Sequence, residues 1–226
     1  MPTAIITGAS RGLGRALTIA LHQRGYALAV DARHRVALHQ AVAGLDRVVA
    51  LTGDITDPQH RAELINAAPG PVDLIVNNAS TIGPSPQPQL ADYPLQALRD
   101  VYATNVVAPL ALIQLALRRL APGARIINVS SDAAVEPYPG WGGYGSSKAA
   151  LEQLTAILAA EQPDLRIYAA DPGDMCTQMH QDAFPGEDIS DRPAPEERVA
   201  GFLALIEGEH PSGRYVVQNL IAAAER

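Results

Sequence analysis

The chain has 226 residues, of which 47% are hydrophobic and 18% are charged, and it carries a net charge of −7. These proportions exclude an intrinsically disordered chain. The negative charge argues against a nucleic-acid partner, because phosphate binding needs clustered cations. The single cysteine, Cys176, excludes a disulfide framework and a cysteine-based zinc site.

The N-terminal residues enter a strand-like pattern directly, without a basic segment that would mark a targeting signal. No apolar run approaches the roughly 20 residues of a membrane span. We therefore expect a soluble, cytoplasmic protein with neither a membrane nor a nucleic-acid partner.

Short apolar runs alternate with longer helical patterns along the whole chain. In chain order, strands are predicted over residues 4–7, 27–31, 47–51, 74–77, 125–129, 166–170 and 214–217, and helices near 13–24, 34–43, 58–67, 94–120, 145–161 and 195–207. Strict alternation predicts an α/β fold with a doubly wound parallel sheet of about seven strands, the Rossmann fold. The alternation continues after each Pro/Gly-rich piece, so residues 1–226 are predicted to form a single domain.

Three glycines follow the first strand, in the sequence TGASRGLG over residues 7–14. Glycines at this place permit a tight turn and a close approach of the backbone to a pyrophosphate, which the helix N-terminus then attracts. Glycine-rich turns are common, so a purely structural turn is the alternative. The GxxxGxG spacing resembles the TGxxxGxG signature of the short-chain dehydrogenase/reductase family. The resemblance implies a dinucleotide site formed by Gly8, Ser10, Arg11, Gly12, Leu13 and Gly14.

The end of the second strand indicates which dinucleotide is preferred. The position that holds an acid in NAD-preferring members of the family falls on Ala32, and Arg33 follows it. Arg33 and Arg11 together suit a 2′-phosphate, because guanidinium groups bind phosphate in a bidentate manner. We therefore expect NADP(H) to be preferred over NAD(H). Asp31 lies one residue early and should point to the other side, but a shift of one residue would make it a ribose ligand.

Three further segments resemble the cofactor cleft of the family. Asp54 and Ile55 follow the third strand, where an Asp holds the adenine, and Asn77, Asn78 and Ala79 resemble the NNAG motif, with Ser80 in place of its glycine. After the sixth strand, Pro172, Gly173 and Thr177 resemble the PGxxxT motif that meets the nicotinamide carboxamide. Without the resemblance, Asp54 and the two asparagines would be interpreted as turn residues. Cys176 and His180 supply too few ligands for zinc, so no metal site is expected.

Lys148 is the only lysine, beside 16 arginines. A composition bias explains the arginines, but an ammonium is a compact charge that a guanidinium does not replace. Lys148 lies four residues after Tyr144, on the same face of a predicted helix. An ammonium near a phenol lowers its pKa from about 10 and so produces a general acid and base. The spacing alone is weak evidence, since such pairs also occur on solvated helix faces.

The neighbouring motifs strengthen the resemblance. Ser131 lies thirteen residues before Tyr144, which is the separation found in the family, where this serine binds the substrate carbonyl. Asn105 matches the Asn that the family uses in a proton relay through water to the lysine. The resemblance thus implies a catalytic set of Asn105, Ser131, Tyr144 and Lys148, with Tyr144 and Lys148 also touching the cofactor.

We therefore predict an NADPH-dependent reductase of ketones or aldehydes, or the reverse alcohol dehydrogenase. The substrate would lie between residues 135–143, with Tyr138 and Trp141 as walls, and an irregular flap over 178–198. The alternatives are a non-catalytic dinucleotide-binding regulator on the same fold and an epimerase or dehydratase of the same family. A homodimer or homotetramer through the 94–120 and 145–161 helices is the family expectation. The closing segment, residues 213–220, departs from the family pattern.

Overall fold

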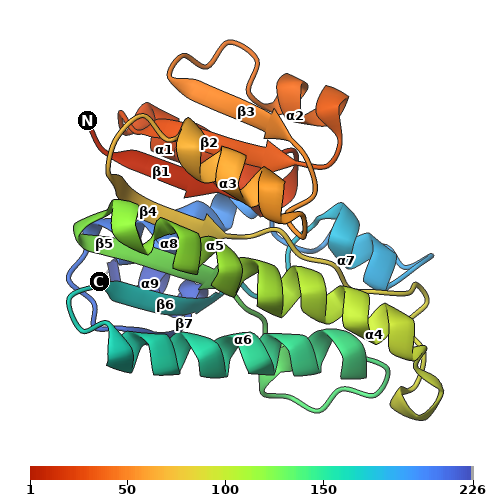
Figure 1. Ribbon diagram of the computed structural model, residues 1–226. Coiled ribbons are helices and arrows are strands. Elements are labelled where there is room, and N and C mark those ends of the chain that lie inside the picture. The colour runs from red at the N-terminus through yellow and green to blue at the C-terminus, as the bar shows by residue number, and fades with distance from the viewer. Residues whose placement is uncertain (225–226) are drawn as a thin grey trace.

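A single parallel sheet organises the computed structural model, which describes residues 1–224. Its seven strands lie in the order β3-β2-β1-β4-β5-β6-β7 (Figure 1). Their bounds are β1 Thr3–Ile6, β2 Ala27–Ala32, β3 Val48–Thr52, β4 Val72–Asn77, β5 Leu120–Val129, β6 Arg166–Asp171 and β7 Gly213–Val216. Every neighbouring pair is parallel, which confirms the predicted doubly wound fold.

Helices cover both faces of this sheet (Figure 1). They are α1 Gly12–Gln23, α2 Arg35–Ala41, α3 Pro58–Ala67, α4 Leu95–Tyr102, α5 Ala108–Ala116, α6 Gly142–Glu161, α7 Gln178–Ala183, α8 Val199–Glu207 and α9 Val217–Ala224. Alternate residues of each strand face opposite layers. In β1, Ala4 and Ile6 pack with Leu17 of α1 and Phe202 of α8, whereas Ile5 packs with the helices of the other layer. The sheet therefore separates two apolar cores.

The predicted helix over 94–120 is interrupted in the structure. Helix α4 is followed by a π-helical segment, Ala103–Val107, then by α5 and a 3-10 turn, Leu117–Arg119. The whole stretch, Leu95–Arg119, is long and apolar enough to cross a membrane by length and composition. A core helix of a soluble protein passes the same test, and 44% of the most apolar window is buried inside this structure.

Two other predictions need correction. The segment over 178–198 is not wholly irregular, because α7 occupies its beginning and the 3-10 turn Pro195–Arg198 its end. The closing strand ends at Val216 instead of Val217, and the chain continues as helix α9. Val217 is fully buried against the α8 layer, so its apolar side chain belongs to the helical layer and not to the sheet.

The strand order reverses beside β1, whose neighbours are β2 on one side and β4 on the other. Loops that leave the carboxyl ends of these strands turn toward opposite faces of the sheet, and a crevice opens between them. The fold thus places the residues after β1, β4, β5 and β6 around one opening.

Candidate active site

One cleft of about 810 Å³ lies at the carboxyl ends of the strands. Most of the predicted site residues line it: Gly8, Ser10, Arg11, Gly12, Leu13, Arg33, Asp54, Ile55, Asn78, Ala79, Ser131, Tyr144, Lys148, Pro172, Gly173 and Thr177. Three predicted residues, Gly14, Asn77 and Asn105, lie behind its wall. The volume is in the range of a cofactor site.

The turn after β1 brings the backbone of Gly8 against the loop after β4. Gly8 has φ +70°, and a Cβ there would lie 2.9 Å from the Cα of Ala79. A Cβ on Gly14 would overlap with the carbonyl oxygen of Gly8, so Gly14 permits close packing of α1 on the turn. The resulting backbone cradle at the start of α1 fits the pyrophosphate of a dinucleotide.

Asp31 is held inside the protein and does not extend toward a ribose. One carboxylate oxygen accepts a hydrogen bond from the Gly8 N–H at 2.9 Å, and the other contacts Nε2 of His60 at 2.9 Å. Both side chains are buried. The hydrogen bond to Asp31 raises the pKa of His60, against the opposing effect of burial. Arg11 and Arg33 are exposed at the cleft, and within residues 1–224 neither forms an ion pair.

Of the other residues expected around the cofactor, some line the cleft and one supports it from beneath. Asp54 accepts two hydrogen bonds from Thr56, at 2.8 and 2.7 Å, which outweigh partial burial and lower its pKa. Asn78 donates to the carbonyl oxygens of residues 7 and 8 and so braces the glycine turn. Asn77 is buried and donates to Asn128 at 2.8 Å. Asn77 is thus a link between β4 and β5, placed beneath the cleft.

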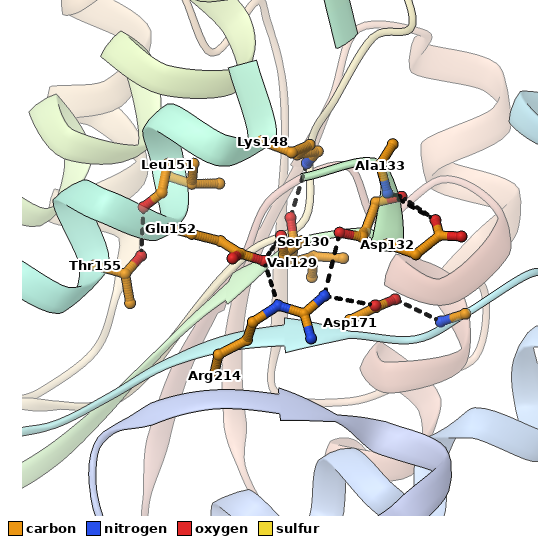
Figure 2. A network of polar contacts seen from close by, with 12 residues as sticks. Val129, Ser130, Asp132, Ala133, Lys148, Leu151, Glu152, Thr155, Asp171 and Arg214 are labelled. Carbon is orange, nitrogen blue, oxygen red and sulfur yellow. Dashed lines mark hydrogen bonds and ion pairs between the residues drawn. The ribbon is translucent and has the colours of Figure 1, made fainter. Parts of the chain in front are cut away.

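Tyr144 and Lys148 lie side by side on α6, as their spacing predicts. The Lys148 Nζ is 5.5 Å from the centre of the Tyr144 ring. It donates to the carbonyl oxygen of Val129 at 2.7 Å (Figure 2). Both side chains are buried. Burial lowers the pKa of Lys148 to about 8.

The expected depression of the Tyr144 pKa is wrong for this structure. Burial raises the pKa of the phenol, and hydrogen bonding to Ser131 and Ser80 only partly opposes it. The ammonium lies beside the ring and uses a hydrogen bond on Val129, so its effect does not outweigh desolvation. Tyr144 is therefore a protonated phenol at neutral pH.

Ser131 lies at the carboxyl end of β5, where its hydroxyl donates to Asp132 at 2.9 Å and accepts from the Ala133 N–H at 3.2 Å. The other oxygen of Asp132 accepts from the Tyr138 hydroxyl at 3.0 Å. Asp132 thus competes for the hydroxyl proton of Ser131. The Ser131 hydroxyl must turn its O–H away from Asp132 before it donates to a substrate oxygen.

Asn105 lies in the π-helical segment, a type of turn that is frequent at functional sites. Its side-chain oxygen accepts from the Ser80 hydroxyl at 3.1 Å and from the Thr81 N–H at 2.9 Å, and its nitrogen donates to the Ser147 hydroxyl at 2.9 Å. The side chain therefore fastens the Ser80 loop to α6. No hydrogen bond joins it to Lys148 within residues 1–224, and the relay stays a prediction.

The turn after β6 begins with Asp171, whose carboxylate accepts from the Gly173 N–H at 2.9 Å. Thr177 caps α7, because its hydroxyl accepts from the His180 N–H at 3.2 Å. The turn expected to meet the nicotinamide is therefore held at both ends, by Asp171 and by the start of α7.

Apolar side chains line the part of the cleft next to Tyr144. Trp141 packs edge-on against the Tyr144 ring with centroids 5.8 Å apart, and its centroid is 5.7 Å from that of Phe184. Ile82 is buried against Tyr144, with Met179 packed beside them. Trp141 was expected here, and Met179 and Phe184 belong to the 178–198 segment that was expected to bound the substrate. Ile82 was missed, since a single apolar residue in a loop gives no local signal.

Comparisons with known proteins show the family of the chain. The family model described as short chain dehydrogenase matches residues 2–188. The chain is similar to the short chain dehydrogenase penD of Penicillium thymicola, at 31% identity over 96% of this chain and 90% of that protein. It is also similar to the sepiapterin reductase of Mus musculus, at 32% identity over 78% of this chain and 76% of that protein. The structure of a short chain dehydrogenase from Shigella flexneri complexed with NADP superposes with a TM-score of 0.86, at 25% identity over 96% of this chain and 97% of that chain.

The fold, the glycine turn and the cleft are those of a dinucleotide-binding α/β protein. With the family model and these relatives, the chain belongs to the short-chain dehydrogenase/reductase family and is an NAD(P)-dependent oxidoreductase.

Proposed function

We propose that the protein is an NADPH-dependent carbonyl reductase, in which Tyr144 donates the proton to the substrate oxygen. The observation that carries the proposal is the buried Tyr144–Lys148 pair at the floor of the cleft, with Nζ 5.5 Å from the ring centre. When bound, NADPH supplies the hydride. Reversal of the same steps would oxidise a secondary alcohol.

The protonation states suit reduction. Burial raises the pKa of Tyr144, so the phenol carries its proton at neutral pH and can act as an acid. Lys148, with a pKa of about 8, is largely charged at pH 7 and stabilises the phenolate once the proton has left. Ser131, turned away from Asp132, would donate to the same substrate oxygen as negative charge develops there.

The charges at the adenosine end favour NADPH over NADH. Arg11 and Arg33 are exposed at this end and suit a 2′-phosphate, for which the planar guanidinium is well shaped. The nearby carboxylate, Asp31, has both oxygens engaged by Gly8 and His60 and is not free for a ribose hydroxyl. The relative from Shigella flexneri, complexed with NADP, supports this choice.

The substrate end favours an apolar, uncharged carbonyl compound. Trp141 and Phe184 form an aromatic wall beside Tyr144, and Asp132 lies next to Ser131 in the same cleft. A substrate carboxylate would meet repulsion from Asp132, whereas an aryl or alkyl group would bury apolar surface against the wall. We expect the residues over 178–198 to cover this substrate.

The assembly and the location are part of the proposal. Leu95, Val107 and Leu115 are exposed on the helical layer that contains α4 and α5, and Ile157 is exposed on α6. Apolar residues in this arrangement support a homodimer or homotetramer through these helices. The free thiol of Cys176 supports a cytoplasmic location.

Substitution of Tyr144 by Phe tests the proposal. The Tyr144→Phe variant should bind NADPH like the wild type, measured by cofactor fluorescence, and should lose reduction by about 100-fold or more. A spectrophotometric screen of NADPH and NADH oxidation against ketones, aldehydes and oxo acids identifies the substrate. Tight cofactor binding without turnover of any compound would instead favour the regulator, and unchanged turnover by Tyr144→Phe would overturn the mechanism.

A further inference from the structure

Arg214 on the closing strand reaches three different parts of the active-site framework. Its Nε donates to Glu152 on α6 at 2.9 Å, and one Nη donates to Asp171 at the end of β6 at 2.9 Å. Figure 2 shows Arg214 between Glu152 and Asp171. The Nη that donates to Asp171 also lies 3.5 Å from the carbonyl oxygen of Ser131. The Arg214 side chain is 30% exposed, compared with 14% for Glu152 and 4% for Asp171.

Each of these partners either lines the cleft or bonds a residue that lines it. Asp171 accepts from the N–H of Gly173, in the turn expected to hold the nicotinamide, and the third partner of Arg214 is the main chain of Ser131 itself. Glu152 also accepts from the Ser130 hydroxyl at 2.5 Å, one residue before Ser131. One guanidinium therefore connects the nicotinamide turn, the serine loop and the helix that carries Tyr144 and Lys148.

The geometry of the guanidinium suits this role. Its planar fork directs two nitrogens at two carboxylates, which a single ammonium cannot reproduce. The two carboxylates are largely buried and would repel each other without the cation between them. Arg214 is thus the charge that allows both acids to lie in one network.

We propose that Arg214 is a positioning residue, which holds the serine loop and the nicotinamide turn in register with helix α6. The inference rests on the proposed carbonyl reduction, because the loops that it aligns are those that meet substrate and cofactor there. The conclusion also gives a role to the closing segment, where the sequence departs from the family pattern.

Arg214 also bears on the charge of Lys148. Among the charged groups around the Tyr144–Lys148 pair, Glu152 on α6 acts on the ammonium, whereas Asp132 and Asp171 on neighbouring elements act on Tyr144. Arg214 pairs with both Glu152 and Asp171. The carboxylate of Glu152 raises the pKa of Lys148, against the larger effect of burial. Arg214 shares that carboxylate, so its removal should raise the pKa of Lys148, whereas removal of the carboxylate in Glu152→Gln should lower it.

The test compares Arg214→Met, Arg214→Lys and Glu152→Gln with the wild type. In Arg214→Met, kcat should fall by about 10- to 100-fold through misplacement of the loops, while the affinity for NADPH changes much less. Arg214→Lys should keep the titration midpoint of Lys148 near the wild-type value but recover only part of kcat, because it retains the charge without the fork. Because Lys148 is the only lysine, selective ¹³C labelling of lysine gives a single signal that reports its titration.

Arg125→Met is the matched control. Arg125 is also a partly buried strand arginine, 24% exposed, but it bonds Gly208 and Glu209 away from the cleft. The Arg125→Met variant should leave both kcat and the titration midpoint of Lys148 unchanged. If Arg214→Met does not fold, Arg214→Lys and Glu152→Gln still decide the question by the same two measurements.

Wild-type kcat in Arg214→Lys, or movement of the Lys148 midpoint in the same direction in Arg214→Met and Glu152→Gln, would overturn the inference. If the wild type oxidises NADPH against no carbonyl compound, the proposed function fails on its own. The lysine signal would in that case still show whether Arg214 acts on Lys148.

Discussion

Replacement of Lys148 by Met should stabilise the folded protein at neutral pH while it abolishes reduction. Lys148 is buried, and burial lowers its pKa from the ordinary 10.5 to about 8. This difference corresponds to about 3 kcal/mol of unfavourable free energy for the charged group in the folded state at pH 7. Methionine removes this cost but also the hydrogen bond to Val129, which contributes about 1 kcal/mol. The expected net gain in the free energy of unfolding is about 2 kcal/mol.

The pH dependence separates these two contributions. The unfolded chain binds more protons than the folded one between pH 8 and 10.5, so the stability contributed by this group rises with pH in that window. The cost of the charged lysine falls from about 3 kcal/mol at pH 7 to below about 1 kcal/mol at pH 10. The stability difference between wild type and Lys148→Met should therefore depend on pH, because only the wild type has the titrating group. The loss of the hydrogen bond to Val129 does not cancel this dependence.

Urea denaturation of wild type and Lys148→Met at pH 7 to 10 measures the difference directly. We expect the advantage of the variant to shrink by about 2 kcal/mol across this range. A difference that stays constant with pH, or a lysine signal that titrates near 10.5, would refute the reasoning. At pH 7 the gain corresponds to a rise in Tm of about 4 to 8 °C for a chain of this size.

Four other outcomes follow from the site. Arg33→Ala should weaken NADPH binding by about 10- to 100-fold and NADH binding little, measured by fluorescence titration, because it removes charged hydrogen bonds to the 2′-phosphate; equal losses would contradict the predicted preference. Lys148→Arg should lose most turnover, since the planar guanidinium does not fit the space of the ammonium. Near-normal activity would show that the reaction does not require a lysine at this position. The rate of reduction should fall as pH rises through about 8, where Lys148 loses its charge while Tyr144 stays protonated; a profile that is flat to pH 10 would oppose this assignment. His60→Leu should cost about 3 kcal/mol of stability at pH 6, because Asp31 loses its buried partner. This cost should shrink as pH rises through the raised pKa of His60, and a cost that does not depend on pH would show that His60 acts by packing alone.

Local spacing was sufficient to predict the glycine turn and the Tyr144–Lys148 pair. Gly8 and Gly14 lie in one loop, and four residues bring two side chains to one helical face, so both features depend on short-range geometry. The alternation of strands and helices likewise predicted the sheet, since buried parallel strands carry continuous apolar runs.

Long-range contacts could not be predicted in this way. The Asp31–His60 pair joins residues 29 apart in the chain, and the Arg214–Glu152 pair joins residues 62 apart. The raised pKa of Tyr144 depends on burial by several separate segments, so the sequence alone gave the wrong direction. The interruption of the long helix was missed for a related reason: the apolar pattern continues through Ala103–Val107, and the contacts that Asn105 makes there with Ser80 and Ser147 are long-range.

The π-helical segment around Asn105 has a consequence for how this chain tolerates changes in length. A π-turn is equivalent to an α-helix into which one residue has been inserted. Deletion of Thr104, next to Asn105, would restore regular α-helical geometry and leave the faces of α4 and α5 aligned, because the wider π-turn takes up its extra residue without rotating the flanking turns. The buried Val101 would stay on the core side, but Asn105 would lose the turn geometry that places it beside the Ser80 loop. We therefore expect the length of this segment to be much less variable among natural variants than the exposed loops around it.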